Sequence, residues 1–226
     1  MLTVLNVQKV LNVRVLKVLP VLMVLAAGSA GAQDAPRGYL EGTVGVARAI
    51  ETDSSYAGLG AWRVNDRVHV FGEVGRMRNV IGQELDDHLT AIGADIRSRT
   101  EAQFGTTFPV EFEARVPMWY GLGGVRVSGP STARLSTFVD AGLGSARLDP
   151  QGHLTINGER LDNDVAAIAG FGEDSQQLEF LTGLGGGVAV QAWKRVRVEG
   201  AYRYMRLYGD AKTNINRLAL SAGWSF

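Results

Sequence analysis

Charged side chains recur at alternate positions in segments that are otherwise apolar or rich in glycine. Arg197, Glu199 and Arg203, for example, share one face of an extended segment whose other face carries Val196, Val198 and Tyr202. Charges that come together away from water must pair, because an unpaired buried charge is costly. We expect four acids and four arginines from different segments to form one ion-pair network in an enclosed space: Glu41, Glu73, Arg115, Asp140, Arg197, Glu199, Arg203 and Arg217.

The residue types that hydrolysis or metal binding requires are sparse. The chain has three histidines and no cysteine. His69, His88 and His153 stand in no recognisable arrangement with a serine nucleophile, and the motifs of phosphate, dinucleotide and zinc sites do not occur. The acidic segment 162–174 lacks the spacing of an EF-hand loop, although Ca²⁺ binding there stays open. We therefore predict no catalytic residue, no cofactor, no metal site and no enzymatic activity.

The elements that would position these charges are strands, because the dominant hydrophobic period is two. The last segment shows it best, with Leu218, Leu220, Trp224 and Phe226 on one face and Arg217 on the other. Each segment is long enough to cross a membrane as a tilted strand. The pattern predicts eight antiparallel strands, at about 38–50, 55–64, 67–77, 113–127, 134–147, 177–191, 194–208 and 213–226.

The expected connections differ in length on the two sides of this set of strands. Three are tight turns, and the long ones are 78–112 and 148–176. Short turns on one side and long loops on the other are typical of an up-and-down transmembrane β-barrel. The non-apolar faces are mostly Gly, Ala and Ser with isolated charges, which suits the narrow interior of an eight-stranded barrel. The fold predicted is thus all-β, with the strand 213–226 closing the barrel.

Residues 1–32 have the features of a secretory signal peptide. Lys9, Arg14 and Lys17 precede the apolar run 18–27, and Ala30-Gly31-Ala32 resembles a cleavage site. The run is too short to span a membrane as a helix. We predict a signal peptide at 1–32, a barrel domain at 33–226 and a destination in the bacterial outer membrane.

The chain resembles the small eight-stranded outer-membrane proteins of the OmpA/OmpX kind. The resemblance covers about 38–226 and includes the final segment Leu218-Ala-Leu-Ser-Ala-Gly-Trp-Ser-Phe226. It implies that Trp224 and Phe226 belong to a signal that the barrel-assembly machinery reads. It also implies a structural, surface-interaction or narrow-pore role, because no single chemistry follows from this fold. A lipid A-modifying outer-membrane enzyme and a soluble lipocalin-like periplasmic binding barrel are the alternatives.

The two long loops carry local patterns of their own. Residues 79–102 have helical period, with an apolar stripe at Ile81, Leu85, Leu89, Ile92 and Ile96 and a possible cap at Asn79. Residues 154–156 and 159–161 flank Asn157-Gly158, which predicts a hairpin. We expect a short helix in one extracellular loop, and these loops could bind an extracellular partner.

The overall charge does not favour nucleic acid as a partner. The whole chain has a formal net charge of zero, which gives no support for nucleic-acid binding, because such binding needs a basic face. The expected partners are instead the outer-membrane lipid and the barrel-assembly machinery, and we expect a monomer without cofactors.

Overall fold

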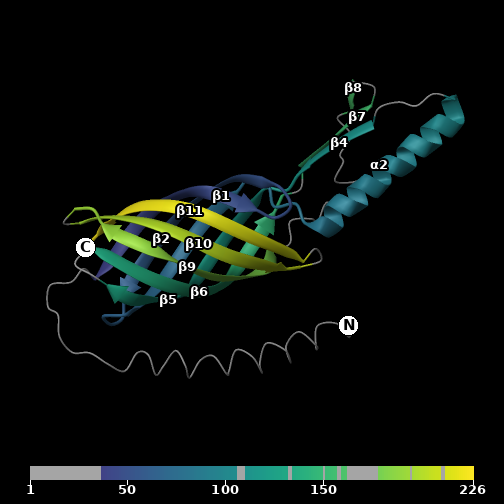
Figure 1. Cartoon of the computed structure of the whole chain (residues 1–226). Coiled ribbons are helices and arrows are strands. Elements are labelled where there is room, and N and C mark those ends of the chain that lie inside the picture. Colours follow the sequence, from purple (N-terminus) through teal and green to yellow (C-terminus); the bar gives the residue numbers. More distant parts are fainter. Residues whose placement is uncertain are drawn as a thin grey trace, which may run out of the picture.

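Eight long strands close into one antiparallel barrel in the computed structural model (Figure 1). The structure describes residues 37–105, 110–131, 134–149, 151–156, 159–161, 178–193, 195–209 and 212–226. The signal peptide expected at 1–32 and the acidic segment 162–174 lie outside these residues. Among the described residues, no helix has the length and apolar content needed to cross a membrane.

Consecutive barrel strands are neighbours throughout, and the last pairs with the first. The barrel strands are β1 (Gly38–Arg48), β2 (Thr52–Arg63), β3 (Val68–Met77), β5 (Met118–Ser131), β6 (Leu135–Leu148), β9 (Leu178–Gln191), β10 (Val196–Tyr208) and β11 (Thr213–Ser225). This is the up-and-down arrangement that the alternating sequence predicts. Closure leaves no open edge, so the backbone groups of each strand pair on both sides.

The ring closes where β11 meets β1. These strands pair from Tyr39 with Ser225 to Arg48 with Asn216. The last residue adds to the seam, because the carbonyl of Phe226 accepts hydrogen bonds from the amides of Arg37 and Gly38 at 2.6 and 3.1 Å.

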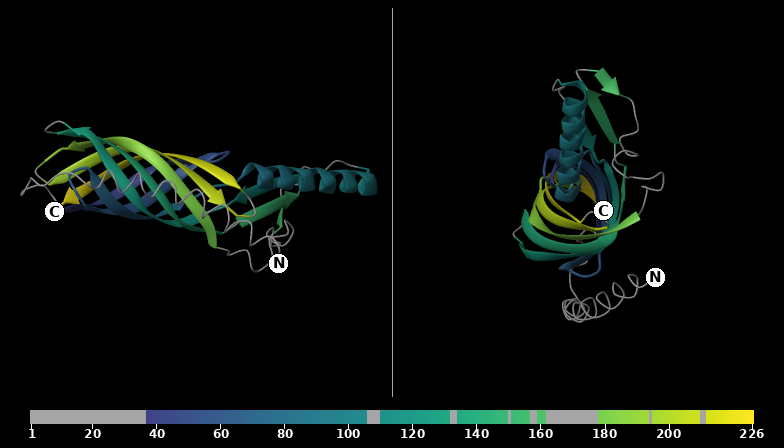
Figure 2. Two further views of the ribbon diagram at one scale, coloured as in Figure 1. Left: turned by 90° about the horizontal axis from the view of Figure 1, so that it is seen from below. Right: turned by 90° about the vertical axis from the view of Figure 1, so that its right-hand side faces the viewer.

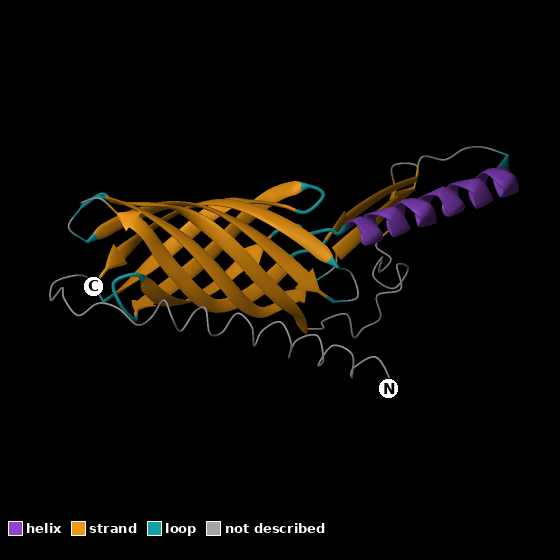
Figure 3. Ribbon diagram, turned by 60° about the horizontal axis from the view of Figure 1, so that its bottom comes forward, coloured by secondary structure: helices purple, strands orange, loops and turns teal. Residues whose placement is uncertain are grey.

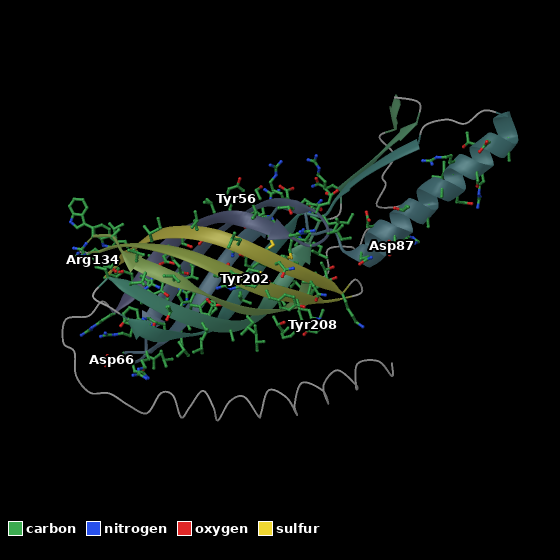
Figure 4. The ribbon with its side chains drawn as sticks, in the orientation of Figure 1. Tyr56, Asp66, Asp87, Arg134, Tyr202 and Tyr208 are labelled. Atoms are coloured by element: carbon green, nitrogen blue, oxygen red, sulfur yellow. The ribbon has the colours of Figure 1, made fainter. Side chains whose placement is uncertain are left out.

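The alternation of each strand divides its side chains between the wall and the interior. Leu40, Val44, Leu218 and Leu220 point outward and are about 60% exposed, whereas Glu41 on the same wall is 4% exposed. Figure 4 shows Tyr56, Tyr202 and Tyr208 on the outer surface as well. The apolar face is therefore outside, which is the polarity of a membrane barrel.

The barrel has a turn end and a loop end. β2 and β3, β5 and β6, and β9 and β10 are joined at the turn end, where the C-terminus also lies (Figure 2). The barrel begins at the same end, because the amide of Gly38 donates to the carbonyl of Phe226. One of these turns is held by Asn65, whose Oδ1 accepts hydrogen bonds from the amides of Arg67 and Val68 at 3.0 and 2.9 Å. The two long connections, between β3 and β5 and between β6 and β9, both leave from the loop end.

An extramembrane arm projects from the loop end (Figure 3). It contains α2 (Gln83–Phe104) and a second sheet of β4 (Val110–Arg115), β7 (Gln151–Ile156) and β8 (Glu159–Leu161), in the order β4-β7-β8. The strands of the expected hairpin pair from Ile156 with Glu159 to Leu154 with Leu161. The sequence did not indicate that β7 would also pair with β4.

The helix differs from the expected one at its start. It begins after Gly82 without a side-chain cap and ends at Gly105, whose φ is 67°. Asn79 is therefore not the cap, and Ile81 precedes the helix and belongs to the buried core. The expected apolar stripe is thus divided between the barrel and the arm.

The expected strand 113–127 is wrong in its bounds. The chain forms β4 up to Arg115 and starts β5 at Met118, with Val116 and Pro117 between them. Proline has no N–H for a strand ladder, which favours a break at this place. From Met118 to Leu122 the apolar side chains at even positions face the interior, and Trp119 faces outward.

Candidate functional site

The interior of the barrel holds eight charged residues in one unbroken series of ion pairs, which we call the ion chain. Basic and acidic residues alternate along it, and its net charge is zero. The order is Arg217, Glu73, Arg203, Asp140, Arg126, Glu199, Arg197 and Glu41. They come from β1, β3, β5, β6, β10 and β11, so the chain connects walls that are far apart in sequence.

Two arginines form the centre of the ion chain. Arg203 contacts Glu73 at 2.5 Å and Asp140 at 2.9 Å. Arg126 contacts Asp140 at 2.9 Å and Glu199 at 2.7 Å. The side chains of all five residues are 6% exposed or less. Each guanidinium therefore bridges two carboxylates, and the fork of arginine suits this bidentate use.

The end of the ion chain nearer the loops includes a tyrosine. Glu73 pairs with Arg217 and accepts a hydrogen bond of 2.5 Å from the hydroxyl of Tyr120. Arg217 donates to the same hydroxyl at 2.7 Å and to Ser55 at 3.2 Å. Tyr120 has room because Gly75 lies beneath it, where a Cβ atom would come within 2.5 Å of the hydroxyl. The absence of a side chain at Gly75 thus allows this contact.

The other end of the ion chain lies toward the turns. Arg197 contacts Glu199 at 3.0 Å and Glu41 at 3.0 Å. Aromatic rings pack against the same cations, because Arg197 lies 4.5 Å from the ring centroid of Tyr39 and Arg126 lies 3.8 Å from that of Phe138. Cation–π contacts of this kind strengthen when they are desolvated.

A second layer inside the barrel is apolar. It lies at the loop end, and we call it the apolar plug: Met77, Met118, Leu181, Met205, Leu207 and Ile215. All six are 0% exposed. These residues stand at the loop-end termini of five strands, so their side chains meet across the interior. The interior is thus ionic at mid-barrel and dry at the loop end.

The chain between β3 and α2 covers the apolar plug. Val80 and Ile81, together with Val116, belong to the same buried core. Asn79 holds them in place: its Oδ1 accepts hydrogen bonds from the amides of Ile81 and Val116 at 3.3 and 3.0 Å. Its Nδ2 donates to Glu51 at 3.0 Å. A 4% exposed asparagine therefore connects three segments above the plug.

Little open volume remains around the ion chain. A cavity of about 20 Å³ lies among Glu73, Arg126, Glu199, Arg203 and Arg217. This is enough for about one water molecule. The Nη2 of Arg217 and the Nε of Arg126 are buried and have no hydrogen-bond acceptor among the described residues, so a water in this cavity would find donors.

The structure brings together seven of the eight residues expected in the network. Arg115 is the exception: it ends β4 in the arm and is exposed. Its place is taken by Arg126 of β5. The sequence indicated that Arg126 faces the interior, because Met118, Tyr120, Leu122 and Arg126 all lie at even positions of β5. The expected strand 113–127 began before Pro117 and had its even positions on the lipid side, so Arg126 was not expected inside the barrel.

The other polar residue types are dispersed. His69 faces the interior and packs against Tyr39 with ring centroids 5.8 Å apart. His88 lies on α2 and His153 on β7. Within the part of the chain that is described, no group of three or more His, Cys, Asp or Glu residues could hold a metal ion. The ion chain and the apolar plug are therefore the main constructed features of the interior.

Comparisons with known proteins concern the fold alone. No protein-family model and no curated protein matches the sequence. Among solved structures, Neisserial surface protein A matches with a TM-score of 0.51 and 11% identity, over 86% of this chain and 100% of that one. A major outer membrane protein from Thermus thermophilus matches with a TM-score of 0.51 and 11% identity, over 84% of this chain and 99% of that one. The chain therefore has the fold of the small eight-stranded outer-membrane β-barrels.

Proposed function

We propose that this protein is a sealed outer-membrane barrel that anchors its extramembrane arm at the cell surface for interaction with a partner. The observation that carries the proposal is the double filling of the barrel, with the apolar plug above the ion chain. A barrel that conducts solutes needs a continuous wet path, and dry apolar constrictions oppose conduction. The arm at the loop end is then the part left for a specific task.

The location in the outer membrane is supported by the outward apolar face and by the basic and apolar composition of residues 1–32. The loop end would face the outside, since the termini and tight turns occupy the other end. Trp224 and Phe226 both point outward at the closing seam, with exposed fractions of 52% and 49%. This outward position supports a role for both rings as an assembly signal, because neither ring is needed to fill the interior.

The surface-interaction role rests on how the arm is built. It has its own paired strands, from Val110 with Ile156 to Arg115 with Gln151. Its helix is mostly exposed along its length and carries the ion pair Asp95–Arg99 at 2.9 Å. A folded, exposed element that the barrel does not need for closure is suited to recognition.

The first experiment is fractionation of cells that express the full chain, followed by gel electrophoresis with and without boiling. We expect the protein in the outer-membrane fraction, with a band that shifts on boiling, because a closed barrel resists detergent until heated. Recovery in the soluble periplasm would contradict the proposed location.

The second experiment measures ion current through the purified barrel in planar bilayers. We expect the wild type to show no channel steps. A triple variant, Met205→Ser with Leu207→Ser and Arg203→Ala, should introduce steps, because it opens both the apolar plug and the ion chain. The matched control is Arg203→Ala, which alters the ion chain and leaves the plug intact, and it should remain silent. Current through the wild type would overturn the sealed-barrel proposal.

A further inference from the structure

The charges on the outer wall of the barrel all have the same sign. Among the described residues of the eight barrel strands, every charged side chain at an outward-facing position is an arginine: Arg48, Arg76, Arg147 and Arg206. Each lies within the last three residues of its strand at the loop end. We call these four residues the arginine rim. At the turn end, the outward-facing strand positions carry no charge.

The best-defined part of the arginine rim spans three strands. Arg76 is paired in register with Trp119, and Trp119 is paired with Arg147. The guanidinium of Arg76 lies 5.3 Å from the centroid of the Trp119 ring. Since neighbours in such a row are about 5 Å apart, the two arginines flank one indole on the same exposed surface.

A second arginine lies beside an aromatic ring on β10, on the far side of the barrel from β3. Arg206 lies 5.3 Å from the ring centroid of Tyr208. Its Nε is buried and has no hydrogen-bond acceptor among the described residues. Within the same part of the chain, no ion pair involves Arg48, Arg76 or Arg206. These guanidiniums are therefore without carboxylate partners on the described surface.

We propose that the arginine rim binds the phosphate groups of anionic lipids in the membrane leaflet at the loop end. This inference rests on the proposed membrane location. The rim lies directly above the apolar band, where lipid headgroups begin, and its side chains point sideways toward lipid. Arginine matches phosphate with two parallel hydrogen bonds, and tryptophan and tyrosine favour the same interfacial depth. A free protein partner in the water above would meet the arm instead.

The asymmetry gives the inference its specificity. Trp62, Trp224 and Phe226 lie outward at the turn end, and Trp62 and Phe226 have ring centroids 6.2 Å apart. That end thus has interfacial aromatics without strand arginines. The exposed arginines of the turn end, such as Arg134 and Arg195, lie in the turns and not on the outer wall. A lipid rich in phosphate is therefore expected to associate with the wall at the loop end, so the rim would discriminate between the two leaflets.

The test uses the purified full chain in detergent micelles, titrated with lipid A that carries two phosphates and followed by native mass spectrometry. We expect wild type to retain phosphorylated lipid A more strongly than dephosphorylated lipid A. The variant Arg76→Gln with Arg147→Gln should lose about fivefold in affinity for each arginine removed. The variant Arg48→Gln with Arg206→Gln should lose a comparable amount.

The matched control removes the same charge at the other end, as Arg134→Gln with Arg195→Gln, and should bind like wild type. Inorganic phosphate should not compete, because it lacks the acyl chains that place the lipid against the wall. Equal binding by all variants, or competition by inorganic phosphate, would overturn the rim as a lipid site. Gel electrophoresis with and without boiling distinguishes loss of lipid binding from loss of folding. A variant whose band still shifts on boiling is a folded barrel, whether or not it binds the lipid.

Discussion

At the scale of single residues, the ion chain shows how charges can be buried inside a small barrel. Arg203 alone holds two carboxylates from two other strands, Glu73 and Asp140. Removing one partner of a buried pair costs more than the pair contributes, because the remaining charge stays desolvated. The energetic role of each arginine is therefore to keep its neighbours paired.

We predict that Arg203→Ala lowers the free energy of unfolding by about 3–5 kcal/mol. The measurement is urea unfolding in lipid vesicles, followed by tryptophan fluorescence. Arg134→Ala, at an exposed position, should change the stability by less than about 0.5 kcal/mol. Adding Asp140→Asn to Arg203→Ala should recover part of the loss, because it removes the excess negative charge that the loss of Arg203 leaves in the ion chain. A stability of Arg203→Ala equal to that of Arg134→Ala would contradict the prediction.

The sequence predicted most of the charged interior but not its complete membership. Alternation placed Glu41, Glu73, Asp140 and Arg217 correctly because each lies within an uninterrupted strand. It failed for Arg126 because the start of β5 had to be located first. Which arginine bridges which carboxylate depends on register between strands distant in sequence, and alternation within one strand carries no information about that.

At the scale of elements, the barrel and the arm meet at a narrow junction. The amide of Val80 donates to the carbonyl of Val116 at 3.0 Å, and Asn79 joins the same two segments. The chain thus leaves β3 and returns to β5 at nearly one point. Everything from α2 to β4 lies beyond this point, so the β3–β5 pairing does not depend on it.

We predict that replacing 83–114 by a Gly-Ser-Gly-Ser linker leaves a folded barrel, because Val80 and Val116 already bring the ends together. The measurement is the band shift on boiling, which should persist. The control places the same linker in place of 119–122 within β5, and this variant should lose the shift. A loss of the shift on deletion of 83–114 would mean that the arm is needed for barrel closure.

The elements also show where sequence patterns are reliable. Period-two alternation located seven of the eight barrel strands to within a few residues, because each has one face in lipid and one inside. The hairpin at 154–161 followed from its turn residues. The pairing of β4 with β7 is a contact between two loops. β4 does alternate, with Val110, Phe112 and Ala114 on one face, but alternation within one strand does not indicate which strand it pairs with.

At the scale of the whole molecule, closure depends on the seam between β1 and β11. The backbone of Phe226 contributes there through its carbonyl and through its amide, which donates to Gly38 at 2.9 Å. The side chain points outward and contributes nothing to the interior. Backbone and side chain of the last residue therefore have separable roles.

We predict that Phe226→Ala reduces the amount of assembled protein in the outer membrane several-fold, while refolding into detergent micelles is nearly unchanged. The physical reason is that alanine keeps the backbone bonds of the seam and removes only the outward ring. Quantitative gels of membrane fractions measure the first effect, and band-shift kinetics measure the second. The control is Leu220→Ala, an outward position on the same strand. Equal loss in cells and in micelles would show that the ring acts in folding and not as an assembly signal.

The ion chain also has a consequence for how this architecture could change over evolutionary time. Bacterial barrels of this kind have even strand numbers, so growth proceeds by whole hairpins, and the diameter rises with each pair of strands. A wider ring would draw Arg203 away from Glu73 and Asp140 and leave charges stranded in the interior. The ion chain therefore limits the barrel to its present circumference. A ten-stranded descendant would need either to lose these charged residues or to hydrate them with water in the interior.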